Sequence, residues 1–157
     1  MKTSTSMDAK MNEALSKKLF DDFPRLYRNR HESSMQRGFE CGDGWFELIY
    51  KLSQDIEAVA RESGLKPDLP EWPWCRGVKQ KFGSLRFQVV AVECLLGVYE
   101  RISYLRNAAS IQSFNICEQC GARGTLLMCD GQLCILCLEH AEKLCPSAVP
   151  VDWRSIW

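Results

Sequence analysis

Long apolar runs, an excess of either charge, and histidine are all scarce in this 157-residue chain. No stretch reaches the roughly 18 consecutive apolar residues that a membrane span requires. The polar segment Met1–Lys10 does not resemble a secretion signal. Twenty basic side chains balance twenty acidic ones, which argues against indiscriminate nucleic-acid binding through a basic excess. We therefore expect a cytoplasmic protein without a membrane partner.

The motifs that usually mark an active site are also scarce. The sequence contains no glycine-rich phosphate loop and no nucleophile elbow. Of the two histidines, His31 is expected to be an ordinary surface residue. The sequence therefore predicts a protein without enzymatic activity.

Cysteine, in contrast, is abundant, with nine in the chain. An odd number of cysteines without a secretion signal argues against a secreted disulfide scaffold. Cys41, Cys75 and Cys94 are scattered singly, and we expect them to be buried as small apolar side chains. The other six crowd between Cys117 and Cys145, and a cluster of this density indicates a metal site.

Hydrophobic periodicity predicts three helices before the cysteine cluster. Apolar residues recur at helical spacing from Asp8 to Phe23, from Trp45 to Ala60, and from about residue 92 to residue 113. Asp43 or Gly44 is expected to cap the second helix, because both lie in a turn sequence just before it.

Between the second and third helices the periodicity changes from helical to alternating. Leu85, Phe87 and Val89 alternate with more polar positions after the turn residues Phe82-Gly83, which predicts a β-hairpin over 78–92. The expected fold is α+β, with helices packed on a β-hairpin or a small antiparallel sheet. We expect a flexible N-terminus over 1–7, an α+β domain over 8–114, and a zinc-binding module over 115–157 packed on that domain.

The cysteine cluster has the spacing of a zinc site. Cys117 and Cys120 form a CxxCG motif, in which two thiolates converge on one ion and glycine allows the tight turn. Asp130-Gly131 predicts a hairpin, and a helix is expected to begin near residue 136. Cys137 and His140 then lie three residues apart on one side of that helix. Knuckle, hairpin and helix in this order predict a treble-clef-like finger with a structural Zn²⁺ held by four protein ligands.

Cys134 is an alternative to His140 as the fourth ligand. Cys134 and Cys137 form a second CxxC, and both spacings are compatible with zinc sites that have two paired ligand motifs. We favour His140 because Cys134 is expected in a strand and to point away from Cys117 and Cys120. A redox role for the second CxxC is disfavoured, since no βαβ unit surrounds it.

A candidate partner surface lies on the predicted hairpin and the connector before it. Lys79, Lys81 and Arg86 give this hairpin a local positive excess, and Trp72 and Trp74 stand in the proline-rich connector. Arginine and aromatic side chains are favoured at interface hot spots. The cations also suit contacts with nucleic-acid phosphates, while a solvated strand face is the simplest interpretation of the same residues.

Four blocks of the sequence together resemble a family of small proteins encoded by tailed bacteriophages and prophages. The blocks are Cys41-Gly42-Asp43-Gly44-Trp45, the segment Lys79–Phe87, the CxxCG motif at Cys117, and the CxxH motif at Cys137. The resemblance favours Cys137 and His140 over Cys134 as ligands. It also implies a phage context, in which small accessory proteins often bind and disable a host component, including defence systems such as CRISPR complexes.

Our leading hypothesis is therefore a non-enzymatic, zinc-stabilised phage accessory protein that binds a host protein or protein complex, with an anti-defence, anti-CRISPR-like role. The alternative is a nucleic-acid-binding or regulatory zinc protein that uses the basic hairpin. The sequence leaves the oligomeric state open.

Overall fold

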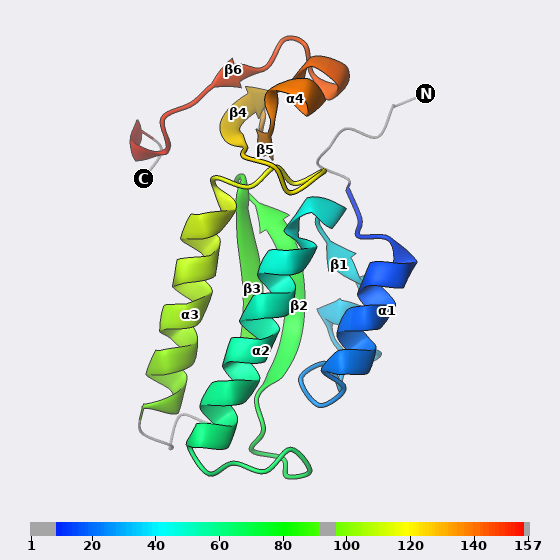
Figure 1. The fold of residues 1–157 in the computed structure, drawn as a ribbon, viewed down its shortest axis with the longest axis vertical. Coiled ribbons are helices and arrows are strands. Elements are labelled where there is room, and N and C mark those ends of the chain that lie inside the picture. Colours follow the sequence, from blue (N-terminus) through cyan, green and yellow to red (C-terminus); the bar gives the residue numbers. More distant parts are fainter. Residues whose placement is uncertain (1–8, 92–96, 156–157) are drawn as a thin grey trace.

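The computed structural model describes residues 9–91 and 97–155 (Figure 1). The expected flexible segment 1–7 and Cys94 lie outside the described residues. The fold is mixed α+β, as expected, with four α-helices and two small sheets within the described residues. The helices are α1 (Glu13–Asp22), α2 (Phe46–Glu62), α3 (Val98–Ser113) and α4 (Leu138–Leu144). The strands are β1 (Phe39–Glu40), β2 (Trp74–Lys81), β3 (Ser84–Val90), β4 (Thr125–Cys129), β5 (Gln132–Leu136) and β6 (Val149–Pro150).

The larger part of the molecule, which we call the body (9–91 and 97–114), is built on the sheet β1-β2-β3. Strands β2 and β3 form the predicted antiparallel hairpin, whereas β1 pairs with β2 in parallel. Helix α2 lies over one face of this sheet, α3 lies next to α2 and alongside β3, and α1 lies beside β1 (Figure 1). The core between them is rich in large side chains that are fully buried, among them Tyr27, Phe39, Trp45 and Ile49.

Helix α3 covers the free edge of β3. The backbone N–H of Leu85 donates to Ser113 Oγ at 2.9 Å, and Arg106 Nε donates to the Phe87 carbonyl at 2.6 Å. An uncovered edge strand offers unpaired backbone groups to other chains, so these side-chain bonds close part of that edge. They also fix the position of Arg106 beside the hairpin.

The C-terminal part, which we call the module (115–155), lies at one end of the body, near the tip of the β2–β3 hairpin (Figure 1). Its hairpin β4–β5 turns at Asp130-Gly131, as predicted, and β6 pairs with the other side of β4. One face of the hairpin, with Leu126 and Ile135, joins the core of the body. The opposite face forms a separate small core around Leu127, with Cys117, Cys129, Cys134, Leu136 and Cys145.

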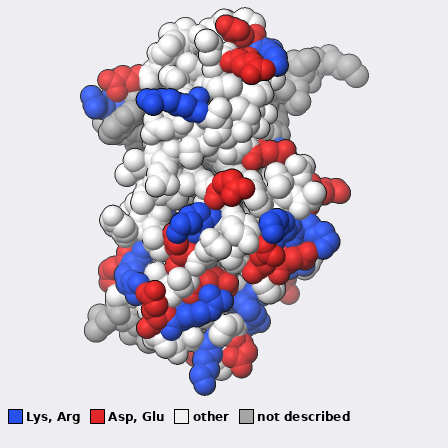
Figure 2. All heavy atoms as spheres, in the orientation of Figure 1, with Lys and Arg blue, Asp and Glu red and all other residues white. Residues whose placement is uncertain are grey.

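Surface charge is distributed unevenly over the two parts. In the view of Figure 2, acidic and basic side chains intermingle over the helices of the body, while most of the module carries neither. Among the described residues, no helix combines the length and the apolar character that crossing a membrane requires. Cys41 and Cys75 are buried, as expected for isolated cysteines.

Candidate metal centre

The first two candidate ligands lie on a tight loop between α3 and β4. The Gly121 N–H donates to the Cys117 carbonyl at 2.9 Å, and the Cys117 N–H donates to the Ala122 carbonyl at 2.7 Å. Gly121 has a φ of 79°, a left-handed conformation that glycine adopts without steric cost. The loop thus brings the Cys117 and Cys120 thiols to the same side, as the CxxCG pattern predicts.

The other two candidate ligands lie at the start of α4. Cys137 is the N-cap residue, and its Sγ accepts a hydrogen bond from the His140 backbone N–H at 3.5 Å. Because the cap and the third helical residue share one side of the first turn, the His140 ring points back toward the Cys137 thiol. The strand-to-helix junction after β5 therefore presents a thiol and an imidazole together.

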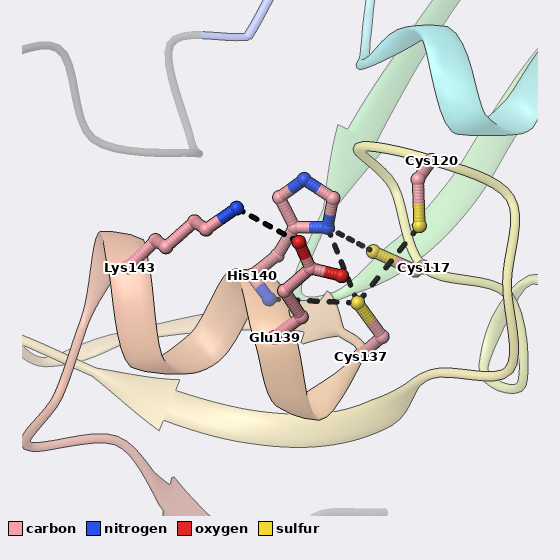
Figure 3. Close-up of polar contacts among 6 residues, drawn as sticks. All are labelled: Cys117, Cys120, Cys137, Glu139, His140 and Lys143. Atoms are coloured by element: carbon pink, nitrogen blue, oxygen red, sulfur yellow. Dashed lines mark hydrogen bonds and ion pairs between the residues drawn. The ribbon is translucent and has the colours of Figure 1, made fainter.

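The structure brings these four side chains into one group that could hold a metal ion (Figure 3). Their ligand atoms all lie within 4.8 Å of one another. Cys120 Sγ and Cys137 Sγ are 3.8 Å apart, and His140 Nδ1 lies 3.8 Å from Cys117 Sγ and 3.2 Å from Cys137 Sγ. Zn–S bonds of about 2.3 Å at tetrahedral angles place two sulfur atoms about 3.8 Å apart, so the spacing suits such an ion.

The pKa values of two of these thiols are shifted in opposite directions. Burial raises the pKa of Cys117 to about 11, whereas the hydrogen bond from the His140 backbone N–H lowers the pKa of Cys137 to about 7. A metal binds the thiolate and not the thiol. A metal ion bound here would therefore displace a proton from the Cys117 thiol, whereas Cys137 is already partly a thiolate near neutral pH.

Cys134, the alternative fourth ligand, lies elsewhere. It is buried in β5, and its thiol donates to the Leu127 carbonyl of β4 at 3.8 Å. Among the described residues, the group around Cys117 includes His140 and not Cys134.

A disulfide joins two other cysteines of the module. Cys129 at the end of β4 is bonded to Cys145 just after α4, with Cα atoms 6.1 Å apart. Sequence reasoning gave these two residues no role. After the ligands are assigned, three cysteines of the module remain, and their spacing alone does not tell which two meet. The bond ties the helix that carries His140 to the hairpin.

The block at residues 41–45 forms a cradle for the loop that carries Cys117 and Cys120, which we call the metal loop. The Gly44 N–H donates to the Glu118 carbonyl at 2.8 Å, and Trp45 Nε1 donates to the Ile116 carbonyl at 2.9 Å. A Cβ on Gly44 would lie 2.1 Å from the Cys117 carbonyl oxygen, so only glycine fits this contact. The cradle therefore couples the body directly to the first ligand.

Asp43, in the same block, does not cap α2 as expected. Its carboxylate instead accepts hydrogen bonds from the Asn12 backbone N–H at 2.8 Å and from Asn12 Nδ2 at 2.9 Å. Helix α2 is preceded by a short 3-10 turn and has Trp45 as its N-cap. Asp43 thus holds the start of α1, where Asn12 is the N-cap residue.

Glu118 completes the cradle from the module side. Its side chain is buried, and burial raises its pKa to about 7. One carboxylate oxygen accepts a hydrogen bond from the Gly42 N–H at 3.4 Å. A buried carboxyl between two candidate ligands shows how closely the loop is enclosed by the body.

The candidate partner residues separate into two groups. Trp72 was a candidate for the partner surface, but only 1% of its surface is accessible, because its indole packs inside and donates to Glu57 at 2.9 Å. Trp72 is thus excluded from any exposed binding surface, and Trp74 is half-buried at the start of β2. Lys79, Lys81 and Arg86, in contrast, line one groove of about 350 Å³ beside α3.

Sequence reasoning also missed a short pattern at the metal group. His140-Ala141-Glu142 has the H-x-E spacing that zinc deaminases use. Those enzymes hold zinc with three protein ligands and leave one position for water. Here four protein donors converge, and Glu142 is exposed and lies outside the group.

Comparisons with known proteins add no relative. No family model matches the chain, and neither a curated protein nor a solved structure shows significant similarity to it. The interpretation of the site therefore rests on its geometry.

Proposed function

We propose that Cys117, Cys120, Cys137 and His140 hold a structural Zn²⁺, and that the chain is a non-enzymatic binding protein stabilised by this ion. The observation that carries the proposal is the convergence of four protein donors within 4.8 Å of one another. Four protein ligands close a tetrahedral shell and leave no position for a reacting water, which distinguishes structural from catalytic zinc. Three thiolates and one imidazole are soft donors that suit zinc better than magnesium or calcium.

We further propose that the module is a treble-clef-like finger. The order of its elements supports this: a CxxCG loop, the hairpin β4–β5, and then α4 with two ligands in its first turn. In this arrangement the ion joins the loop before the hairpin to the helix after it, so it closes the module at both ends.

The binding surface that we propose is the cationic side of the β2–β3 hairpin, with Lys79, Lys81 and Arg86. The hairpin tip contacts the module, because Gln80 Nε2 donates to the Leu133 carbonyl at 2.9 Å and Gly83 lies against Leu126. A zinc-stabilised module at this place holds the tip in one position, and a preorganised surface binds a partner at a lower entropic cost.

The resemblance to phage-encoded proteins leads us to propose an accessory phage protein that acts on a host macromolecule, with inhibition of a defence system as its role. The contacts among the four sequence blocks support the idea that they act together. The block at Cys41 cradles the CxxCG loop, and the tip of the Lys79 block packs against the β4–β5 hairpin that joins the two ligand pairs.

Metal analysis of matched variants tests the zinc proposal. The purified protein is expected to contain one zinc per chain, His140→Ala to lose it, and Cys134→Ser to keep it. Retention in His140→Ala together with loss in Cys134→Ser would contradict the ligand set. In the cobalt-substituted protein, added azide is expected to leave the visible spectrum unchanged, because a closed shell has no site for an anion; a spectral change would indicate a catalytic site.

The biological role has its own test. A bacterial strain with an active CRISPR system is transformed with the gene for the chain, and the plating efficiency of a targeted phage is measured. The proposal predicts increased plaque formation with the natural chain, and no increase with Lys79→Glu/Lys81→Glu. Equal plaque numbers with and without the natural chain, across several defence systems, would contradict the anti-defence role.

A further inference from the structure

The groove beside α3 is cationic on both of its sides. Lys79, Lys81 and Arg86 contribute from the hairpin, and Arg106 contributes from α3. Among the described residues, no aspartate or glutamate lines the groove, and no ion pair engages Lys79, Lys81 or Arg106. The neutral side chains of the lining include Gln88, Asn107 and Ser110, which donate and accept hydrogen bonds. The groove therefore has the chemistry to bind an anion.

Two of these cations face each other across the hairpin. Lys79 lies directly opposite Arg86 in the β2–β3 ladder, and both side chains are half-buried. Like charges at directly opposed positions destabilise an antiparallel pair. An anionic ligand bound near both side chains would reduce this repulsion.

The hairpin turn at the mouth of the groove has an unfavourable residue in its first position. Phe82 and Gly83 have φ angles of 53° and 81°, close to the 49° and 83° of Asp130 and Gly131 in the other hairpin. Asp-Gly suits this left-handed turn, whereas a bulky phenylalanine in its first position is strained. Phe82 nevertheless lines the groove with 56% of its surface exposed, and Lys81 Nζ lies 5.5 Å from the centre of its ring.

An exposed aromatic ring beside a cationic groove is the arrangement that binds single-stranded nucleic acids. The cations follow the phosphate backbone, and the ring stacks on an unpaired base. A duplex keeps its bases stacked on each other and offers no free face to Phe82. Strained residues also persist mainly where a function needs them, which fits the position of this side chain.

From these observations we infer that the groove between the β2–β3 hairpin and α3 binds single-stranded nucleic acid, with Lys79, Lys81, Arg86 and Arg106 at the phosphates and Phe82 stacked on a base. This inference rests on the proposed binding function of the hairpin and names its ligand.

Fluorescence anisotropy of the zinc-loaded full-length protein tests the inference. The probes are labelled single-stranded DNA and RNA oligonucleotides, the matching duplex, and a labelled polyglutamate peptide. We expect tighter binding of a single strand than of the duplex. With three or four phosphate contacts, log affinity is expected to fall with log salt at a slope of about −2 to −3.

Matched variants separate the groove from general charge and general aromatic surface. Lys79→Ala is expected to reduce the magnitude of the slope by about 0.7, whereas Arg76→Ala, on the same strand but outside the groove, leaves the slope unchanged. Phe82→Ala is expected to weaken binding at least about five-fold and Phe82→Tyr to retain it. Tyr104→Ala is the control for an exposed aromatic residue of α3 outside the groove.

Several results would overturn the inference. They are no binding of either single strand at low salt, equal affinity for strand and duplex with no effect of Phe82→Ala, or equal effects of Lys79→Ala and Arg76→Ala. Binding of polyglutamate in place of nucleic acid also overturns it, but leaves the proposed binding function of the hairpin standing. Zinc content is measured on the same samples, so a failure of the metal proposal is detected separately.

Discussion

The body and the module solve the problem of stability in different ways. The body buries a contiguous core with large aromatic side chains, including Tyr27, Phe39 and Trp45. The separate core of the module consists of two leucines and four cysteines. Burial of apolar area contributes about 25 cal/mol per Å². The six buried side chains of the module core therefore provide little stability of their own. On the account proposed above, the module therefore depends on its disulfide and its metal site, whereas the body depends on packing.

The two parts are joined by contacts that depend on the internal order of the module. The module offers one face of its hairpin to the body core through Leu126 and Ile135, and its metal loop lies in the cradle at Gly44. Both contacts require that loop, hairpin and helix keep their relative positions. The disulfide and the proposed metal site hold these parts together, so we expect changes at the cysteines to affect the module far more than the body.

Loss of the metal is expected to have the largest effect. Cys120→Ser removes an exposed ligand that contributes little to packing, and the module is expected to unfold while the body stays folded. Zinc contributes on the order of 10 kcal/mol in small metal-dependent domains. Hydrogen exchange measured by mass spectrometry on fragments is expected to show lost protection in β4, β5 and α4 only. Cys134→Ser is the control, and equal loss in both variants would contradict the distinction.

Loss of the disulfide is expected to rank second. Cys129 and Cys145 are separated by 16 positions, and a cross-link over a loop of this size is worth about 3 kcal/mol. The double variant Cys129→Ala/Cys145→Ala is expected to retain zinc and to unfold at a lower urea concentration. An unchanged unfolding midpoint would show that the metal alone holds the module.

A methyl group in the cradle is expected to have a similar or smaller effect. In Gly44→Ala the new Cβ would lie 2.1 Å from the Cys117 carbonyl oxygen, which forces the loop away from the body at a cost of about 2 kcal/mol. Gly77→Ala is the matched control, because its Cβ would meet only side-chain atoms at 3.1 Å or more. Thermal unfolding compares the two. If Gly77→Ala proved the more damaging, the coupling through the cradle would be refuted.

The smallest effect is expected in the body and has the opposite sign. Lys79→Thr removes the repulsion across from Arg86 and places a strand-favouring residue in β2, so the free protein is expected to gain about 0.5 kcal/mol in its free energy of unfolding. Chemical denaturation measures this gain. A loss of stability would mean that Lys79 has a structural role, which would weaken the argument that the groove is built for an anion.

The sequence predicts the local elements of this fold better than the contacts between them. Helices α2 and α3 and both hairpins follow from periodicity and from the turn residues Phe82-Gly83 and Asp130-Gly131, because these signals are local. Strands β1 and β6 have only two residues each and carry no alternation. The hydrogen bond from Trp72 to Glu57 has no local signal either, since Glu57 lies on another element.

The candidate site shows the same division. The spacing of the CxxCG and CxxH motifs predicts the four residues that converge, because each pair is fixed by one local turn. Neither the disulfide nor the cradle has such a local signal. Gly42 and Gly44 look like ordinary turn residues in the sequence, and only the approach of the loop at Cys117 shows why a side chain is excluded there.

X-ray absorption at the zinc edge of the purified protein tests the central claim most directly, because it counts the atoms bound to the ion. Our account predicts three sulfur atoms at about 2.3 Å and one imidazole nitrogen at about 2.0–2.1 Å. Four sulfur atoms would replace His140 by Cys134, and a bound water oxygen in place of one sulfur would make the centre catalytic. Either result would contradict a closed structural site formed by Cys117, Cys120, Cys137 and His140.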